Sequence, residues 1–401
     1  MKKRIAISLF LAICLLVSLL QQPAMAVSEG VSCHTLAADV ALDGAGRKLE
    51  TAKAVLLYEL NTDTLVHGYN VDKLVNPTGL VKLLTVLVAL EKGDLEDIVT
   101  VKQSTLNTVA VGSVSAKLKS GEEISLRDLL LCIMVASAND ACAVVAAHVG
   151  GSQAGFVAMM NEKAAQLGMK DTHFVNCTGL DDDPNAQQHL TSAYDIALMS
   201  RELMLHHPDI KKFTTIWMDT IRGGTFGLAN TNKLIRFYRG ATGLKTGFTS
   251  AAGYCLSATA QREDLELIAV VMGAESSQDR FNACKQLLDY GFANFALVRP
   301  QPQGVHSVEV KLGKVDFVTV RPAEDAALLV DKGQKNQVDI QVELEQRVTA
   351  PISQGQRLGT LTVRVGDQIL RQIPMVAAEG VQKKNFWDVF VDVLRQIAMA
   401  A

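Results

Sequence analysis

This sequence has no excess of basic residues, no paired CxxC cysteines and no internal repeat. Its 39 lysines and arginines are outnumbered by 42 aspartates and glutamates, which gives a formal net charge of -3. A chain with this balance offers no broad positive surface, so we expect no nucleic-acid partner. Because structural zinc sites usually draw on closely paired cysteines, the scattered cysteines also predict no metal site. The length of 401 residues suits two domains.

A long apolar run lies at the N-terminus and has the layout of a secretory signal. Lys2, Lys3 and Arg4 precede the apolar residues 5–20, and Ala24-Met25-Ala26 supplies the small side chains that signal cleavage needs. We therefore predict a signal peptide over residues 1–26 and an exported mature chain. A retained membrane anchor is the alternative interpretation.

Cysteine usage does not suggest a disulfide scaffold. Cys14 lies inside the predicted signal peptide, and six cysteines remain in the mature chain. We expect most of these six to be buried small apolar side chains. At most one or two disulfides are expected, and the sequence does not assign them.

The first large region mixes helix and strand signals. Residues 52–60 and 64–69 fit a pair of strands, and residues 253–260 and 266–273 fit another. Asn76-Pro77 opens an apolar helix, because asparagine is a favoured cap and proline fits the first helical position. Further helices are expected at residues 152–167, 192–205 and 276–290. These signals predict an α+β domain over residues 35–298.

The pattern changes after the proline-containing linker at residues 299–304. Beyond it, apolar residues alternate with period two, which predicts a small all-β, sandwich-like domain over residues 304–376. Residues 383–401 then place Phe386, Phe390, Leu394 and Ile397 on one helical face, with Trp387 beside them. This pattern is typical of an amphipathic helix on a membrane surface, and packing on the β domain is the alternative.

Three short segments combine the residue types of an acyl-transfer site. They are Gly79-Leu80-Val81-Lys82 at the head of a buried helix, Ser137-Ala138-Asn139 between two helices, and Lys245-Thr246-Gly247 in a strand. Each alone is common: the first lysine is usually solvated, the second segment is usually a helix cap, and the third is usually a turn. Their order along the chain and their expected secondary structure together favour a shared site.

The chain resembles the serine D-alanyl-D-alanine carboxypeptidases, which are low-molecular-mass penicillin-binding proteins. The resemblance extends over nearly the whole mature chain. It includes the trailing β domain and the terminal helix. The segments that carry it, besides the three above, are Ala136 to Cys142, Met160-Asn161, Leu167-Gly168-Met169, Asn176 with Gly179-Leu180, Asn230-Thr231-Asn232, Gly243 to Thr249, Ala252-Gly253-Tyr254 and Arg280-Phe281. The resemblance implies a penicillin-binding/β-lactamase-like transpeptidase domain, with an antiparallel sheet flanked by helices. It also implies that no cofactor is needed.

Gly79 stands where the family has its nucleophilic serine. In that family a serine and a lysine three residues later share one helical face, and the lysine takes the serine proton. Here Lys82 is present and the serine is not. Loss of such a nucleophile costs roughly 10^6-fold in turnover. Thr78 carries the nearest hydroxyl, but one residue on a helix is a rotation of about 100°, so we expect it to point away from Lys82.

The resemblance assigns the remaining residues to substrate binding. It places an oxyanion hole at the backbone N–H groups of residues 79 and 248, and glycine keeps that N–H. It makes Ser137 a proton relay and Asn139 a group that holds the substrate amide and Lys82. The strand of Lys245, Thr246, Gly247 and Phe248 would pair with the peptide, and Gly247 would let the peptide approach closely. Lys245 and Arg280 would recognise its carboxylate.

Two main functions follow from this pattern. The first is a catalytically impaired homologue that binds peptidoglycan stem peptides ending in D-Ala-D-Ala, with β-lactams bound non-covalently. The second is an active carboxypeptidase of cell-wall remodelling with an atypical nucleophile. A β-lactamase relative and a purely structural envelope protein are weaker alternatives. In each of the first two cases we expect peripheral attachment to the outer face of the cytoplasmic membrane.

Overall fold

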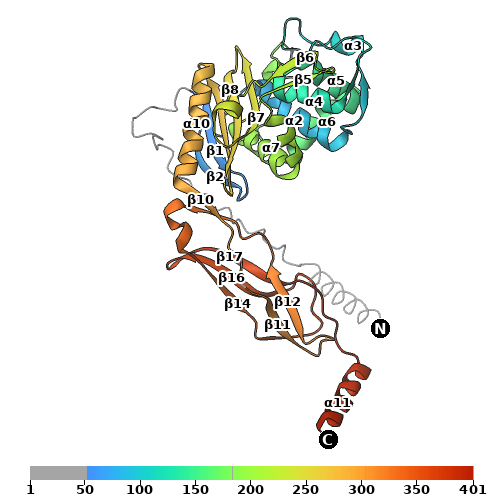
Figure 1. Cartoon of the computed structure of the whole chain (residues 1–401), viewed down its shortest axis with the longest axis vertical. Helices are drawn as coiled ribbons and strands as arrows, with labels where there is room; N and C mark the ends of the chain where they lie inside the picture. Colours follow the sequence, from blue (N-terminus) through green and yellow to red (C-terminus); the bar gives the residue numbers. More distant parts are fainter. Residues whose placement is uncertain (1–51, 183, 303, 401) are drawn as a thin grey trace, which may run out of the picture. The chain divides into compact units, whose positions relative to one another are not determined.

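The computed structural model describes residues 52–182, 184–302 and 304–400. The predicted signal peptide at residues 1–26 and Cys33 lie outside the described residues. Two regions of different architecture follow one another along the described chain, an α+β domain and an all-β domain (Figure 1). The predicted fold class is therefore confirmed.

The α+β domain is built on a five-stranded sheet in the order β2-β1-β9-β8-β7. Neighbouring strands in this sheet are antiparallel, as predicted. The strands are β1 (Ala54–Glu59), β2 (Thr64–Tyr69), β7 (Ala241–Thr249), β8 (Gly253–Arg262) and β9 (Leu265–Ala274). Strand β7 lies at one edge of the sheet, so one side of its backbone is not paired within it.

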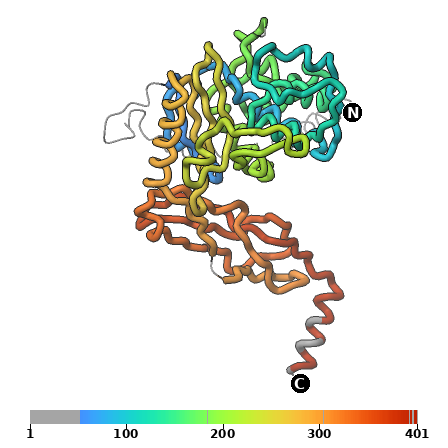
Figure 2. Tube along the Cα trace, turned by 45° about the horizontal axis from the view of Figure 1, so that its top comes forward, coloured from blue at the N-terminus to red at the C-terminus, as the bar shows by residue number. Residues whose placement is uncertain are grey.

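Helices cover both faces of this sheet, as Figures 1 and 2 show. The alternation of side chains along β1 explains this arrangement: Leu56 and Tyr58 belong to one buried core, whereas Val55 and Leu57 belong to the other. Helix α10 (Ser277–Asn294) contributes Phe281, Leu287 and Leu288 to the second core. The remaining helices of the domain pack largely on the first.

The first core is formed mainly by α2 (Lys82–Lys92), α4 (Leu126–Leu131), α5 (Asn139–Val149), α6 (Gln153–Gln166) and α7 (Ala193–His206). Short elements complete the domain: α3 (Gln103–Leu106), α8 (Lys211–Thr214), α9 (Leu234–Phe237), β3 (Ile98–Thr100), β4 (Glu123–Ser125), β5 (Met218–Ile221), β6 (Phe226–Ala229), the 3-10 turns η2 (Thr78–Val81), η4 (Ala186–Gln188) and η5 (Pro208–Ile210), and the π-helical turn η3 (Cys132–Ala136).

The start of α2 differs in detail from the prediction. Pro77, rather than the expected Asn76, occupies the N-cap position of this turn, although Asn76 Oδ1 accepts a hydrogen bond from the Thr78 N–H at 2.8 Å. The first turn is nevertheless a 3-10 turn over Thr78–Val81, and the α-helix begins only at Lys82. Thr78 has a φ of 47°, which a β-branched residue rarely adopts. This tight turn presents residue 79 to the edge strand.

The all-β domain has its own core, which includes Val308, Leu361 and Ile373. Its six-stranded sheet has the order β14-β16-β17-β12-β11-β15. A separate two-stranded sheet pairs β10 with β13, and Leu297 of β10 belongs to the second core of the α+β domain. The elements are β10 (Phe295–Val298), β11 (His306–Lys311), β12 (Phe317–Pro322), β13 (Leu328–Asp331), the 3-10 turn η6 (Lys332–Gln337), β14 (Val338–Leu344), β15 (Arg347–Thr349), β16 (Arg357–Val365) and β17 (Gln368–Ala377), followed by α11 (Phe386–Ala400).

The five cysteines among the described residues are unpaired and buried. This confirms the expectation of small apolar side chains for Cys132, Cys142, Cys177, Cys255 and Cys284. Within the described ranges, no single helix is both long and apolar enough to cross a membrane, although α5 and α6 meet the criteria together as a pair bent by 87°.

A buried carboxylate organises the chain around the α4–α5 junction. Asp140 at the start of α5 is 3% exposed. It accepts hydrogen bonds from the Ala116 N–H at 2.8 Å, the Leu118 N–H at 3.0 Å and the Ser115 hydroxyl at 2.6 Å. The loop before β4 is therefore tied to the turn that carries Ser137 and Asn139.

Replacing this carboxylate should leave buried backbone donors without acceptors. We predict that Asp140→Ala lowers the free energy of unfolding by about 3 kcal/mol. The exposed Asp264→Ala variant is the matched control and should change it by less than about 0.5 kcal/mol. Urea titration followed by circular dichroism measures both, and equal stability of the two variants would contradict this role for Asp140.

Candidate active site

Gly79 and Lys82 lie at the junction of η2 and α2, facing the edge strand β7. A Cβ placed on Gly79 would lie 3.8 Å from Lys82 Nζ and 3.1 Å from the Thr246 carbonyl oxygen. Lys82 is 3% exposed, and its Nζ donates a hydrogen bond to the Thr178 carbonyl at 2.6 Å. Position 79 therefore lies between the lysine and the strand, as a nucleophile position would.

Two glycines allow this close packing. A Cβ on Gly247 would lie 2.6 Å from Thr78 Cγ2 and 2.8 Å from the Gly79 nitrogen. Gly179 has a φ of 80°, and a Cβ there would lie 1.8 Å from the Thr78 carbonyl oxygen. From the sequence we expected Gly247 to let the substrate backbone approach the strand closely. The structure shows that its Cα faces the η2 turn, so glycine is needed there for helix-to-strand packing.

The Thr78 hydroxyl is fully buried and has no hydrogen-bond partner among the described residues. It lies toward β7, because a Cβ on Gly247 would be 3.1 Å from it. The hydroxyl of Thr78 makes no hydrogen bond with Lys82 in the described structure, whose ammonium is directed at Thr178. This geometry agrees with the expectation that Thr78 points away from the lysine.

Ser137 and Lys245 join the second and third segments. Ser137 adopts a left-handed conformation with a φ of 64°, which separates η3 from α5. The Lys245 Nζ donates to Ser137 Oγ at 2.9 Å and to the Thr246 carbonyl at 3.0 Å. The predicted helix break thus places its serine directly against the strand.

Asn139 is placed beside them, but not as predicted. Its side chain is 3% exposed, and its Oδ1 has no hydrogen-bond partner within the described part of the chain. From the sequence we expected Asn139 to contact Lys82, but no hydrogen bond joins these two residues in the described structure. Lys82 instead uses the Thr178 carbonyl, a backbone partner that the sequence analysis missed.

Arg280 supports the strands from the α10 side of the sheet. Its Nη1 donates to the Gly247 carbonyl at 2.9 Å and to the Cys255 carbonyl at 3.4 Å, and the guanidinium lies 5.3 Å from the Tyr254 ring centre. Arg280 was predicted to bind a substrate carboxylate. The described contacts show a buried guanidinium, 8% exposed, that fixes the backbone of β7 and β8.

The outer residues of β7 flank this arrangement. Thr246 Oγ1 donates to Thr231 Oγ1 at 2.7 Å, so its hydroxyl is joined to the Asn230-Thr231-Asn232 segment. Phe248 is 51% exposed, and its ring lies 4.2 Å from that of Tyr254. Phe248 therefore offers an exposed apolar side chain next to Gly247.

Burying two lysine ammonium groups in one site costs electrostatic free energy. Burial lowers the pKa of the Lys82 ammonium, with the nearby Cys142 and Cys177 acting in the opposite direction. Burial lowers the pKa of Lys245 well below its ordinary value, and the charge of Lys82 lowers it further. A lysine with a lowered pKa is more often neutral than an exposed lysine at the same pH, and only the neutral amine can accept a proton in acyl transfer.

Two protein-family models match this chain. Residues 44–276 match the model of the D-alanyl-D-alanine carboxypeptidase family. The chain belongs to this family. Residues 298–383 match the model described as the penicillin-binding protein 5 C-terminal domain, which agrees with the all-β architecture.

Two of the relatives below match more than four fifths of this chain, and the third matches 60%. The chain is 36% identical over 344 residues to the D-alanyl-D-alanine carboxypeptidase DacF of Bacillus subtilis, covering 84% of this chain and 87% of that protein. Penicillin-binding protein 5 of Haemophilus influenzae is similar in structure, with a TM-score of 0.72, 29% identity and coverage of 83% of this chain and 98% of that chain. Penicillin-binding protein D2 of Listeria monocytogenes, in its ampicillin-bound form, shows a TM-score of 0.54 and 31% identity, covering 60% of this chain and 98% of that chain.

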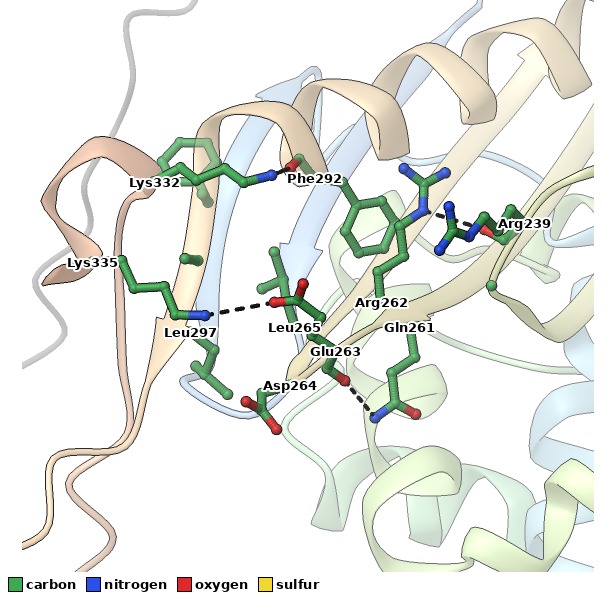
Figure 3. Close-up of a pocket in the computed structure, with 13 residues that line it drawn as sticks. Arg239, Gln261, Arg262, Glu263, Asp264, Leu265, Phe292, Leu297, Lys332 and Lys335 are labelled. Atoms are coloured by element: carbon green, nitrogen blue, oxygen red, sulfur yellow. Dashed lines mark hydrogen bonds and ion pairs between the residues drawn. The ribbon is translucent and has the colours of Figure 1, made fainter.

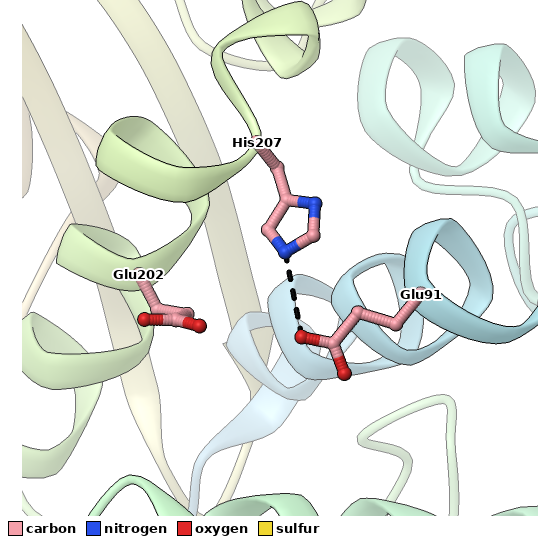
Figure 4. A group of neighbouring side chains, drawn as sticks. All are labelled: Glu91, Glu202 and His207. Carbon is pink, nitrogen blue, oxygen red and sulfur yellow. Dashed lines mark ion pairs between the residues drawn. The ribbon is translucent and has the colours of Figure 1, made fainter.

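Two other groups of polar side chains lie apart from these family residues. Figure 4 shows Glu91, Glu202 and His207 turned toward one another from α2, α7 and the residue after α7. The Lys163 ammonium lies 2.6 Å from Glu91 and 3.1 Å from Glu202, so a protein cation already bridges the two carboxylates. We interpret this group as an ion-pair cluster between helices.

The second group lines a cavity beside the β8–β9 turn. Figure 3 shows Arg262, Lys332 and Lys335 around it. Each of these side chains has a partner: Arg262 Nε donates to the Arg239 carbonyl at 3.3 Å, Lys332 Nζ donates to the Phe292 carbonyl at 2.9 Å, and Lys335 Nζ lies 3.6 Å from Glu263. We assign this cavity no part in the candidate active site.

The buried ammonium of Lys245 predicts a specific pH dependence. Because its pKa is lower in the folded state, the unfolded chain binds more protons, and stability from this group rises with pH up to about 10.4, the ordinary lysine pKa. We expect the stability of the parent relative to Lys245→Met to increase between pH 6 and pH 9. Urea titrations across this range measure the difference. The exposed Lys233→Met variant is the control, and a pH-independent difference for Lys245→Met would contradict the account.

Proposed function

We propose that this chain binds peptidoglycan stem peptides ending in D-Ala-D-Ala and is catalytically impaired as a carboxypeptidase. The observation that supports this is the position of Gly79. It lies between Lys82 and β7, where the family has a nucleophilic serine, and it has no side-chain oxygen. Lys82 lies beside this position, and Lys245 and Ser137 are hydrogen-bonded to each other at the same strand, which supports the proposal.

The inherited reaction explains what is lost. In the family a serine hydroxyl attacks the carbonyl of the penultimate D-alanine, the terminal D-alanine leaves, and water then hydrolyses the acyl-enzyme. Gly79 provides a backbone N–H for a developing oxyanion but no atom that can form the acyl bond. Turnover should therefore fall by roughly 10^6-fold relative to a serine enzyme.

Binding does not require the missing hydroxyl. The edge of β7 offers backbone groups to an extended peptide, as in strand addition. Lys245 lies at the inner side of that strand, with Ser137 and Asn139 beside it. The unpartnered Asn139 Oδ1 supports the proposal, because a buried acceptor of this kind is usually satisfied by a ligand or water. β-Lactams, which resemble the same dipeptide, would occupy the site without forming a covalent bond.

We propose further that the mature chain is exported and attached to the outer face of the cytoplasmic membrane. The N-terminal sequence supports export. Helix α11 supports peripheral attachment, since Phe386 is 74%, Trp387 is 69% and Ile397 is 63% exposed. Large apolar side chains left exposed along one helix are typical of an interfacial helix.

Peptide binding can be measured directly by isothermal titration calorimetry. The purified mature chain should bind an acylated peptide ending in D-Ala-D-Ala and should not bind the L-Ala-L-Ala isomer, because the site is stereospecific in this proposal. Absence of binding to either peptide would overturn the proposal in favour of a structural protein with a relic site.

Restoring the hydroxyl tests the cause of the impairment. A Cβ at position 79 meets backbone atoms at 3.1 and 3.3 Å, so a small side chain should fit after shifts of a few tenths of an ångström. We predict that Gly79→Ser releases D-alanine from a pentapeptide about 10^6-fold faster than the parent.

The matched control is Gly79→Ala, which adds the Cβ without the oxygen and should stay inactive. D-Alanine release measured by a coupled oxidase assay separates the three proteins. Enzymatic rates from the unaltered chain would contradict the proposed impairment and favour an active carboxypeptidase with an atypical nucleophile.

A further inference from the structure

The β11–β12 hairpin carries a group of exposed apolar side chains that the candidate active site does not use. Leu312 is 51%, Val315 is 48% and Phe317 is 61% exposed. Leu312 and Val315 lie between the two strands, and Phe317 is the first residue of β12. Exposed side chains of this size are common singly, but three within six residues form a patch. We call residues 311–317 the hairpin tip.

Four lysines lie in the hairpin tip or in the segment that pairs with it. Lys311 and Lys314 belong to the hairpin tip, and Lys383 and Lys384 belong to the segment that pairs with it. The tip contains one acidic residue, Asp316, whose carboxylate lies 4.0 Å from Lys384 Nζ. The chain as a whole has a net charge of -3, so this local positive charge is not a property of the general surface.

Hydrogen bonds join the hairpin tip to the segment that leads into α11. The Lys314 N–H donates to the Gln382 carbonyl at 2.9 Å, and the Lys384 N–H donates to the Leu312 carbonyl at 2.8 Å. Gly313 and Lys383 form a β-bridge between them. The tip is therefore held beside residues 382–384, which directly precede the start of the amphipathic helix.

The start of α11 is itself well defined. Asn385 and Asp388 exchange hydrogen bonds in a capping box, with both N–H to side-chain oxygen distances at 2.9 Å. Helix α11 begins at Phe386, two residues after the backbone contact of Lys384 with the hairpin. The apolar tip, the lysines and the first aromatic residues of the helix are thus close together along one paired stretch of backbone.

We infer that the hairpin tip is a second membrane-contact element, which docks on an anionic phospholipid surface together with α11. Phe317, Leu312 and Val315 would enter the boundary between headgroups and acyl chains. Lys311 and Lys314 would attract acidic headgroups. Two contacts joined by a short connection bind a surface more tightly than either alone. This inference rests on the proposed membrane attachment of α11.

The lysines favour a lipid surface over a protein partner. Juxtamembrane lysines each contribute about a fivefold gain in binding to anionic membranes. Apolar residues flanked by lysines match a layer whose surface is acidic and whose interior is apolar. A protein partner remains an outcome that the experiment below would reveal.

Vesicle co-sedimentation of the full mature chain tests the inference. The unaltered chain should bind vesicles of phosphatidylglycerol and phosphatidylcholine. Leu312→Ser with Phe317→Ser should weaken this binding about tenfold, since two exposed apolar contacts are lost. Lys311→Gln with Lys314→Gln should weaken it about 25-fold on the anionic vesicles and have little effect on pure phosphatidylcholine.

Matched controls are available elsewhere on the chain. Met218→Ser with Ile369→Ser removes two apolar side chains that are 66% and 57% exposed, and Lys170→Gln with Lys233→Gln removes two exposed lysines. Both control variants should bind as the parent does. Melting temperatures equal to that of the parent would show that every variant is folded.

The outcomes separate the two claims. Phe390→Glu with Ile397→Glu on α11 should abolish binding, and failure of the unaltered chain to bind anionic vesicles would overturn the proposed attachment and this inference together. Binding by the parent, loss in the α11 variant and no change in either hairpin variant would overturn the hairpin inference alone. That result would instead favour a protein partner for the hairpin tip.

Discussion

The contact between the η2 turn and the edge strand β7 is the constraint on which the candidate site depends. Gly247 has no side chain, so Thr78 and Gly79 can pack directly against the strand. This packing places residue 79 near both the Thr246 carbonyl and the Lys82 ammonium. The Lys245 to Ser137 hydrogen bond then fixes the α4–α5 junction against the same strand. A larger residue at position 247 would separate the elements that form the site.

The same packing explains why the absence of one hydroxyl can leave the rest of the site in place. Burial and three hydrogen bonds of the two lysine ammonium groups hold Lys82, Ser137 and Lys245 in place, and none of them involves a side chain at position 79. Catalysis by covalent attack requires the missing atom, whereas recognition of an extended peptide requires the strand edge and buried polar groups. Under the proposed function, peptide binding and turnover would therefore be separable in this chain.

Much of this arrangement could be predicted from the sequence, because local signals were strong. Asn76-Pro77 marked the start of a buried helix, and Ser137-Ala138-Asn139 marked a helix break. The expected strands at residues 64–69 and 253–260 correspond to β2 and most of β8. Alternating apolar residues after the linker predicted the all-β architecture. These features depend on residues close together in the sequence, where spacing carries the information.

The contacts that we did not predict from the sequence join residues far apart in the chain and involve backbone atoms. The Thr178 carbonyl that accepts from Lys82 has no recognisable residue type, and the sequence analysis instead assigned Asn139 to that lysine. Arg280 was predicted to meet a carboxylate, yet it donates to the Gly247 and Cys255 carbonyls. The 3-10 form of the η2 turn likewise follows from tertiary packing at Gly179 and Gly247, which local propensity does not report.

Intact-mass spectrometry after incubation with benzylpenicillin shows whether Gly79 leaves an ordered site without a nucleophile. We expect an unchanged mass for the parent chain and a mass increased by one penicilloyl group for Gly79→Ser under the same conditions. A stable penicilloyl adduct on the unaltered chain, mapped to Thr78 or to any other residue of the site, would contradict it.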